Sequence, residues 1–256
     1  MRLTKIIQSM INEKKVFVFF LLFMFLESKG AFAFQKELPE LEFWTMVDMD
    51  KAITYCESKT RATLNQLKAY EKLPRTIPPN EAHWKTQPVG DWTSGFWAGI
   101  LWYMYDATEN EKIRVEAEKF TDELGSILRQ PLSTHELGFI LNSSFGNGYR
   151  LTGNKEYKKV LLTATDSLMP LFNKNAGTFL SWPAKSGDNI LGPHNSAIDD
   201  IMNLELLFWS AQVTKNKTLA RMVNSHAYVL MNNHIRTDST LFQVSVYDKI
   251  TGVCVR

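Results

Sequence analysis

The chain has 256 residues, of which 45% are hydrophobic and 22% are charged. This length and composition allow one or two globular domains and exclude an intrinsically disordered chain. The formal net charge is +2 and the basic residues form no clustered stripe, so nothing indicates a nucleic-acid partner.

Residues 1–33 have the pattern of a secretory signal. Basic residues begin it, the apolar run VFVFFLLFMFL follows at 16–26, and Ala31, Phe32 and Ala33 offer a small-residue cleavage site. The apolar run is too short to cross a bilayer as a helix. We expect cleavage after Ala33 and an exported product, periplasmic or secreted, of residues 34–256 with no membrane partner. An uncleaved membrane anchor is the alternative.

Helical periodicity recurs along the rest of the chain. Apolar spacing predicts helices over residues 44–73, 93–107, 112–127, 137–152, 155–171, 194–212 and 219–233. Closely spaced prolines predict a loop over 75–89, and glycines without a helical period predict another over 173–193. A strand pattern occurs at 240–246. Helix after helix with short connections predicts an all-α fold.

Cysteines and histidines give no sign of a metal site. The five histidines have no ligand spacing, so we expect no metal and no cofactor. Export would permit a disulfide between Cys56 and Cys254, but a core of this size does not need one. Two unpaired thiols are the simpler interpretation, and the pairing stays open.

The segment 194–212 carries two adjacent aspartates, Asp199 and Asp200, at the expected start of its helix. Acidic residues are favoured there because the unpaired N–H groups and the helix dipole are partly positive. The alternative is that one aspartate points into a pocket beside Asn203 and acts as a catalytic acid and base. Residue chemistry alone leaves both interpretations open.

Three blocks resemble a known family. They are DWTSGFWAGILWYMY at 91–105, HELGFILNSSFGNGYRLTG at 135–153 and IDDIMNLELLFW at 198–209. All three resemble the unsaturated glucuronyl hydrolases, glycoside hydrolase family 88, and occur in the family's order. The resemblance runs from about residue 84 to residue 248. It implies an (α/α)₆ barrel of the six-hairpin glycosidase type, with the active site at one mouth.

The resemblance also implies that this barrel is incomplete at the C-terminus. Only about seven helices of ordinary length fit into the chain, whereas the barrel needs twelve. We therefore expect residues 34–256 to be the N-terminal part of the barrel domain. An open half-barrel would expose apolar helix faces, and a complementing chain or an oligomer could cover them.

Family members release the unsaturated glucuronyl residue from the non-reducing end of oligosaccharides left by polysaccharide lyases. The resemblance implies the same hydrolase activity here. An acid protonates C4 of the C4=C5 double bond, water attacks C5, and the hemiketal opens and expels the neighbouring sugar. Ordinary glycosidases use two carboxylates, whereas one positioned carboxyl group can serve this route.

By resemblance the catalytic acid and base is Asp199, and Asp200 is a helix-start charge. Glu136 stands where the family has its second aspartate, so it either contacts substrate hydroxyls and tunes Asp199 or is a surface acid. His135 either hydrogen-bonds the uronate or holds Glu136. Gln243 occupies the position of a family histidine that contacts substrate.

Aromatic residues are candidates for a sugar platform. Trp182 lies ahead of the catalytic aspartate at a distance similar to that of a family tryptophan, so we expect it to bind substrate. Trp92 and Phe96, near the start of the second predicted helix, fit a platform and a core equally well.

Two alternatives to an active unsaturated glucuronyl hydrolase remain. The chain could be a truncated, inactive relative or a carbohydrate-binding remnant. It could also be an unsaturated rhamnogalacturonyl hydrolase, which shares the barrel and the hydration chemistry.

Overall fold

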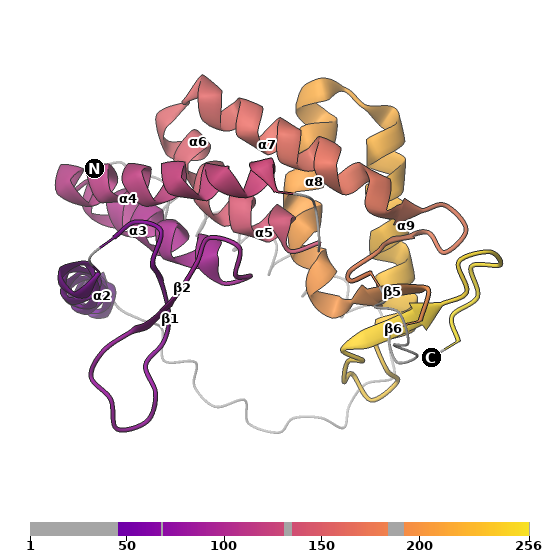
Figure 1. Cartoon of the computed structure of the whole chain (residues 1–256), viewed down its shortest axis with the longest axis horizontal. Helices are drawn as coiled ribbons and strands as arrows, with labels where there is room; N and C mark the ends of the chain where they lie inside the picture. Colours follow the sequence, from indigo (N-terminus) through magenta and orange to yellow (C-terminus); the bar gives the residue numbers. More distant parts are fainter. Residues whose placement is uncertain (1–45, 68, 131–134, 184–191, 256) are drawn as a thin grey trace, which may run out of the picture. The chain divides into compact units, whose positions relative to one another are not determined.

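The computed structural model describes residues 46–67, 69–130, 135–183 and 192–255 (Figure 1). The chain divides into two compact units, Met1–Tyr55 and Cys56–Arg256. The predicted signal at residues 1–33 lies outside the described residues, and the first unit contributes only the start of helix α2, Met46–Gln66. No helix in the described ranges is both long and apolar enough to cross a membrane.

Helix α2 ends earlier than predicted, because the chain turns after it and enters a β-hairpin. Strand β1 (Leu73–Thr76) pairs antiparallel with β2 (Lys85–Gln87), and the register shifts between Pro74 and Thr76. The expected loop over 75–89 therefore contains a hairpin. This sheet has two strands, so both are edge strands. Proline has no N–H to donate and is tolerated at an edge, which explains Pro74 in β1.

The second unit is built from helices, as predicted. Its long helices are α3 (Ser94–Thr108), α4 (Glu111–Leu124), α7 (Lys155–Leu168), α8 (Ile201–Thr214) and α9 (Lys217–His234). Helix α3 packs on α4, α7 on α8, and α8 on α9 (Figure 1). Asparagine caps begin three of them, since the side chains of Asn110, Asn154 and Asn216 accept hydrogen bonds from backbone N–H groups in the first turn.

The helix predicted over 137–152 is interrupted. It consists of α5 (Leu137–Leu141), a π-helical turn (Asn142–Gly146) and α6 (Asn147–Thr152). Gly148 permits the close packing expected of this segment, because a Cβ there would lie 2.7 Å from the ring of Tyr157 and 3.0 Å from that of Trp102. Trp102 is fully buried, and its Nε1 donates to the Thr121 hydroxyl at 2.8 Å.

Four short strands lie in the last part of the chain. Strand β3 (Phe172–Asn173) pairs with β4 (Thr178–Phe179), and β5 (His194–Ala197) pairs with β6 (Val244–Tyr247), all antiparallel. The expected loop over 173–193 thus contains a hairpin. The predicted helix over 194–212 is wrong at its start, because residues 194–197 pair with β6 and a 3₁₀ turn, Ile198–Asp200, precedes α8.

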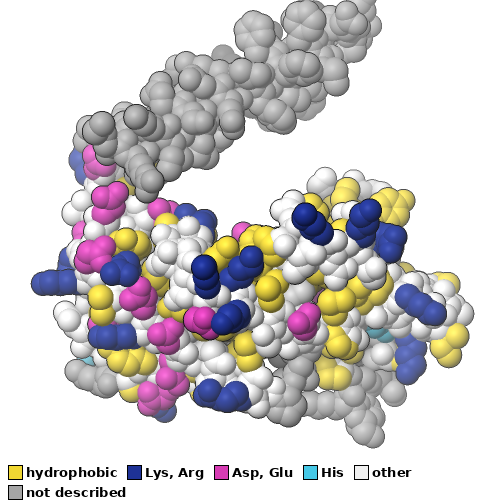
Figure 2. All heavy atoms as spheres, turned by 90° about the horizontal axis from the view of Figure 1, so that it is seen from above, with side chains coloured by type: hydrophobic (Ala, Val, Ile, Leu, Met, Phe, Trp, Pro, Cys, Tyr) yellow, Lys and Arg dark blue, Asp and Glu magenta, His cyan; other side chains and the backbone are white. Residues whose placement is uncertain are grey.

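Apolar side chains are exposed on several helices. Examples are Ile100 and Tyr103 on α3, Phe208 on α8, and Met231 on α9. On the face drawn in Figure 2, apolar, basic and acidic side chains are interspersed. Cys56 and Cys254 are both exposed and form no disulfide within the described ranges.

Candidate active site

The candidate site lies where the β5–β6 ladder ends and α8 begins. Ala197 pairs with Val244, and the next residue, Ile198, donates its backbone N–H to the carbonyl of Gln243 at 2.9 Å. The ladder therefore holds the 3₁₀ turn and its aspartates against the end of β6. The side chain of Gln243 is exposed at this edge.

Asp200 is enclosed by polar side chains. It is 1% exposed, and its Oδ2 accepts hydrogen bonds from Ser181 Oγ at 2.6 Å and Ser196 Oγ at 2.9 Å. Its Oδ1 forms an ion pair with His135 Nδ1. The prediction of a simple helix-start charge is wrong, because the carboxylate caps no helix N–H and is committed to this network.

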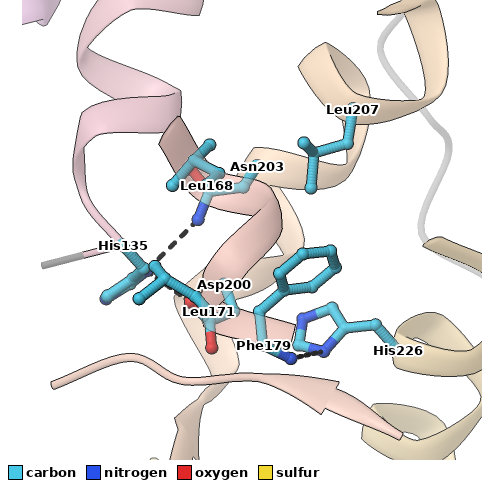
Figure 3. Close-up of a pocket in the computed structure, with 8 residues that line it drawn as sticks. All are labelled: His135, Leu168, Leu171, Phe179, Asp200, Asn203, Leu207 and His226. Carbon is cyan, nitrogen blue, oxygen red and sulfur yellow. Dashed lines mark hydrogen bonds and ion pairs between the residues drawn. The ribbon is translucent and has the colours of Figure 1, made fainter. Parts of the chain in front are cut away.

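His135 joins the two aspartates. The ring is buried, its Nδ1 faces Asp200, and its Nε2 lies 3.8 Å from Asp199 Oδ2. The backbone N–H of His135 donates to the Ser181 carbonyl at 3.1 Å. The side-chain amide of Asn203 lies 3.2 Å from Nδ1 (Figure 3). His135, two positions before α5, is thus placed against the start of α8, which sequence spacing could not show.

The ion pair shifts the pKa values of both partners. Burial by itself would lower the pKa of His135, but the hydrogen bond to Asp200 and the charge of Asp200 raise it. Burial by itself would raise the pKa of Asp200, but the hydrogen bond from His135 and its positive charge lower it. Both shifts favour a charged carboxylate beside a charged imidazolium.

Asp199, the predicted acid and base, lies at the rim of this network. Its side chain is 33% exposed. Its Oδ1 is buried and accepts no hydrogen bond from the described residues. A carboxylate with one oxygen near an imidazolium and open access to solvent can exchange protons with a bound molecule. This geometry is compatible with the predicted role.

Glu136 immediately precedes α5 and is half-buried. Its charge contributes to the raised pKa of His135, after the hydrogen bond from His135 to Asp200 and the charges of Asp200 and Asp199. Glu136 therefore belongs to the same electrostatic cluster. Its predicted contact with substrate remains a prediction.

The predicted aromatic residues form one continuous row. Ring centroids are 6.1 Å apart between Trp92 and Phe96, and 6.0 Å between Phe96 and Phe139. The row continues through His135 to Trp182, with separations of 5.9 and 5.4 Å. Trp92 is 42% exposed, and Phe96 and Trp182 are half-buried. Trp92, Phe96 and Trp182 can therefore offer ring surface to a sugar, whereas the buried Phe139 and His135 only connect them.

Two residues of this arrangement were missed in the sequence. Phe139 bridges Phe96 and His135, and its only signal was its place in the HELGF block. Asn195 holds the backbone of Trp182, since its Oδ1 accepts from the Trp182 N–H at 3.1 Å and its Nδ2 donates to the Trp182 carbonyl at 2.7 Å. An asparagine within a strand has no pattern that predicts such a clamp.

A small cavity lies beneath the site. It is lined by His135, Leu168, Leu171, Phe179, Asp200, Asn203, Leu207 and His226 (Figure 3). His226 Nδ1 accepts the backbone N–H of Phe179 at 3.2 Å, which makes the ring neutral. Burial lowers the pKa of His226 to about 4.

These histidines predict how stability depends on pH. When the pKa of a buried base in the folded protein lies below its unfolded value of 6.5, the free energy of unfolding falls as pH falls from 6.5 towards the folded pKa. His226 accounts for a loss of up to about 3 kcal/mol in the free energy of unfolding. Burial also lowers the pKa values of His194 and His234, so these two residues increase the loss. His135 has a raised pKa, so its stabilising contribution is fully present below pH 6.5. This contribution offsets only part of the loss caused by the other three histidines.

We expect the free energy of unfolding, measured in urea, to fall between about pH 6.5 and 4. His226→Asn keeps an acceptor for the Phe179 N–H and should flatten this dependence. The exposed His83→Asn is the matched control and should leave it unchanged. Equal pH dependence in all three proteins would contradict the assignment.

No cluster of three or more histidine, cysteine, aspartate or glutamate side chains in the described ranges has metal-binding geometry.

Comparison with known proteins relates the chain to one family. No protein-family model matches it. It is 28% identical over 209 residues to an unsaturated glucuronyl hydrolase of Formosa agariphila, with 80% of this chain and 51% of the relative covered. An unsaturated chondroitin disaccharide hydrolase of Streptococcus pneumoniae is 31% identical over 167 residues, which cover 63% of this chain and 41% of the relative.

A solved structure agrees with these matches. An unsaturated glucuronyl hydrolase specific for heparin superimposes with a TM-score of 0.72 at 31% identity, covering 81% of this chain and 55% of that one. The chain thus spans about half the length of the relatives it matches. Their fold is the (α/α)₆ barrel, so the predicted fold class is confirmed.

Proposed function

Since this chain is a homologue of the unsaturated glucuronyl hydrolases over about half their length, we propose that it is a glycoside hydrolase acting on unsaturated uronyl oligosaccharides. The observation that carries the proposal is the partly exposed Asp199 beside buried His135, at the end of the row from Trp92 to Trp182. A single carboxyl group next to a sugar-binding surface suits the hydration of a C4=C5 bond.

In the proposed reaction Asp199 gives a proton to C4 of the unsaturated ring. Water attacks C5 as the Asp199 carboxylate takes up a proton from it, so the acid is regenerated. The hemiketal at C5 then opens by breaking its bond to the ring oxygen, which leaves a ketone at C5 and a hemiacetal at C1. Collapse of this hemiacetal to an aldehyde releases the neighbouring sugar as an alcohol. Atoms and charges balance without an oxidant, a reductant or a metal.

The remaining predicted residues bind substrate in this proposal. Trp182 and Trp92 stack on sugar rings, with Phe96 supporting Trp92 from its edge. Glu136 accepts hydrogen bonds from substrate hydroxyls. Gln243, exposed beside the start of the 3₁₀ turn, donates one.

Unsaturated fragments of glycosaminoglycans are the proposed substrates. The Streptococcus pneumoniae relative is named for chondroitin disaccharide and the solved relative for heparin, which supports this class for the present chain. We further propose that residues 1–33 direct export to the periplasm or medium.

A test of the reaction uses two disaccharides of equal linkage, one with a C4=C5 bond and one saturated. Hydration predicts that the chain releases the reducing-end sugar from the unsaturated disaccharide and leaves the saturated one intact. Cleavage of both at similar rates would contradict hydration and favour ordinary glycosidic hydrolysis by two carboxylates.

A second candidate function is carbohydrate binding without catalysis. One observation favours it: apolar side chains are exposed on α3, α8 and α9. A partner chain or a second copy that covered these faces would then be needed for activity. Binding of the unsaturated disaccharide without turnover would support this candidate.

A further inference from the structure

The carboxylate of Asp200 has no part in the proposed reaction, yet it is the most enclosed acidic group of the site. We propose that Asp200 is a positioning residue for this reaction, which fixes the ring of His135 and holds it as an imidazolium whose Nε2 faces Asp199. The inference rests on the proposed function. Its structural part, the Asp200–His135 pair, can be tested without any turnover.

The two carboxylate oxygens of Asp200 have different partners. Its Oδ2 accepts from two hydroxyls, Ser181 at 2.6 Å and Ser196 at 2.9 Å. Ser181 is itself held in place, because its Oγ accepts the backbone N–H of Ala197 at 2.7 Å. Donors to a carboxylate favour its ionised form. The other oxygen, Oδ1, is left to His135 Nδ1.

The ring of His135 is held from several sides. Its backbone N–H is bound to the Ser181 carbonyl, and its ring packs at steep angles against Phe139 and Trp182. With Nδ1 committed to Asp200, the free nitrogen is Nε2. Nε2 is buried, has no hydrogen-bond partner among the described residues, and lies 3.8 Å from Asp199 Oδ2.

Charged groups around the ring all favour the imidazolium. Asp200 and Glu136 act on it as carboxylates, as does Asp199 once it has given up its proton, and the net effect is a raised pKa of His135 in spite of its burial. His226 lines the same cavity, but burial keeps it neutral near pH 7, so it adds no opposing positive charge. A cation beside Asp199 stabilises the carboxylate that remains after its proton has gone to C4.

The first test is an NMR titration of the histidine ring nitrogens in the full chain, with the His135 signal identified by its loss in His135→Gln. In the wild type the midpoint of His135 should lie above its ordinary value. In Asp200→Asn it should fall by about one pH unit or more, since burial then prevails. The exposed Asp166→Asn is the matched control and should change nothing.

An unchanged midpoint in Asp200→Asn would overturn the proposal. If this variant does not fold, the wild-type titration decides: a midpoint above the ordinary histidine value supports the pair, and one below it overturns the pair.

The second test is kinetic. Asp200→Asn should lower kcat about tenfold or more and change KM little, because the substrate does not touch Asp200. A raised KM with unchanged kcat would contradict the positioning role. Absence of turnover in the wild type would contradict the proposed function and the catalytic consequence, while the titration still decides whether Asp200 holds His135 as an imidazolium.

Discussion

Replacing Gly95 by alanine should cost about 3 kcal/mol or more of stability, or prevent folding. Gly95 is buried in α3, and a Cβ there would overlap the carbonyl oxygen of Ile140 and lie 2.6 Å from its Cα. The obstacle is the backbone of α5, which cannot move aside as a side chain can. Overpacking of this kind is strongly destabilising. The measurement is urea unfolding of the purified variant.

Gly90→Ala is the matched control for this prediction. Gly90 is exposed, and the nearest atom to a Cβ there is a Gln130 side-chain atom at 3.9 Å. It should unfold at nearly the wild-type urea concentration. If Gly95→Ala were as stable as Gly90→Ala, α3 and α5 would not lie as close as described, and the place of His135 just before α5 would be in question.

The second large effect concerns Asp199→Asn, which should lower kcat/KM about 10² to 10⁴-fold. The amide has nearly the same size and can still accept a hydrogen bond, but it can neither give a proton to C4 nor take one from water. Because the side chain is one-third exposed and has few partners, stability should change little. Rates are measured with an unsaturated disaccharide.

Asp166→Asn removes the same charge from an exposed position on α7 and should keep full activity. Activity retained in Asp199→Asn would contradict its role as acid and base. Glu136→Gln would then become the decisive variant, because Glu136 is the other acid that the family resemblance assigns to the site.

Much of the helical framework could be predicted from the sequence. Helices α3, α4 and α9 lie within a few residues of their predicted ranges, because apolar spacing marks each helix and an asparagine cap marks the start of two of them. Strand β6 overlaps the strand pattern predicted at 240–246. The hairpins β1–β2 and β3–β4 and the pairing of β5 with β6 could not be predicted, because strands of two to four residues are too short for an alternating pattern and β5 lies far from β6 in the chain.

The candidate site divides in a similar way. Asp199 and Glu136 were predicted through blocks that resemble a family, and Trp182 was predicted by its distance ahead of Asp199. Asp200 was misassigned because its partners, His135 and Ser181, lie far from it in the sequence, and nothing local distinguishes a helix-start charge from a buried carboxylate. Long-range contacts of this kind require the fold.

The most direct test of the proposed function is the ultraviolet absorbance of the conjugated C4=C5 bond in an unsaturated chondroitin disaccharide. With the purified chain alone, absorbance should fall at a rate proportional to chain concentration, and Asp199→Asn should slow the fall about 10² to 10⁴-fold. Constant absorbance in the presence of a folded chain that binds the disaccharide would contradict the hydrolase function and leave carbohydrate binding as the activity of this chain.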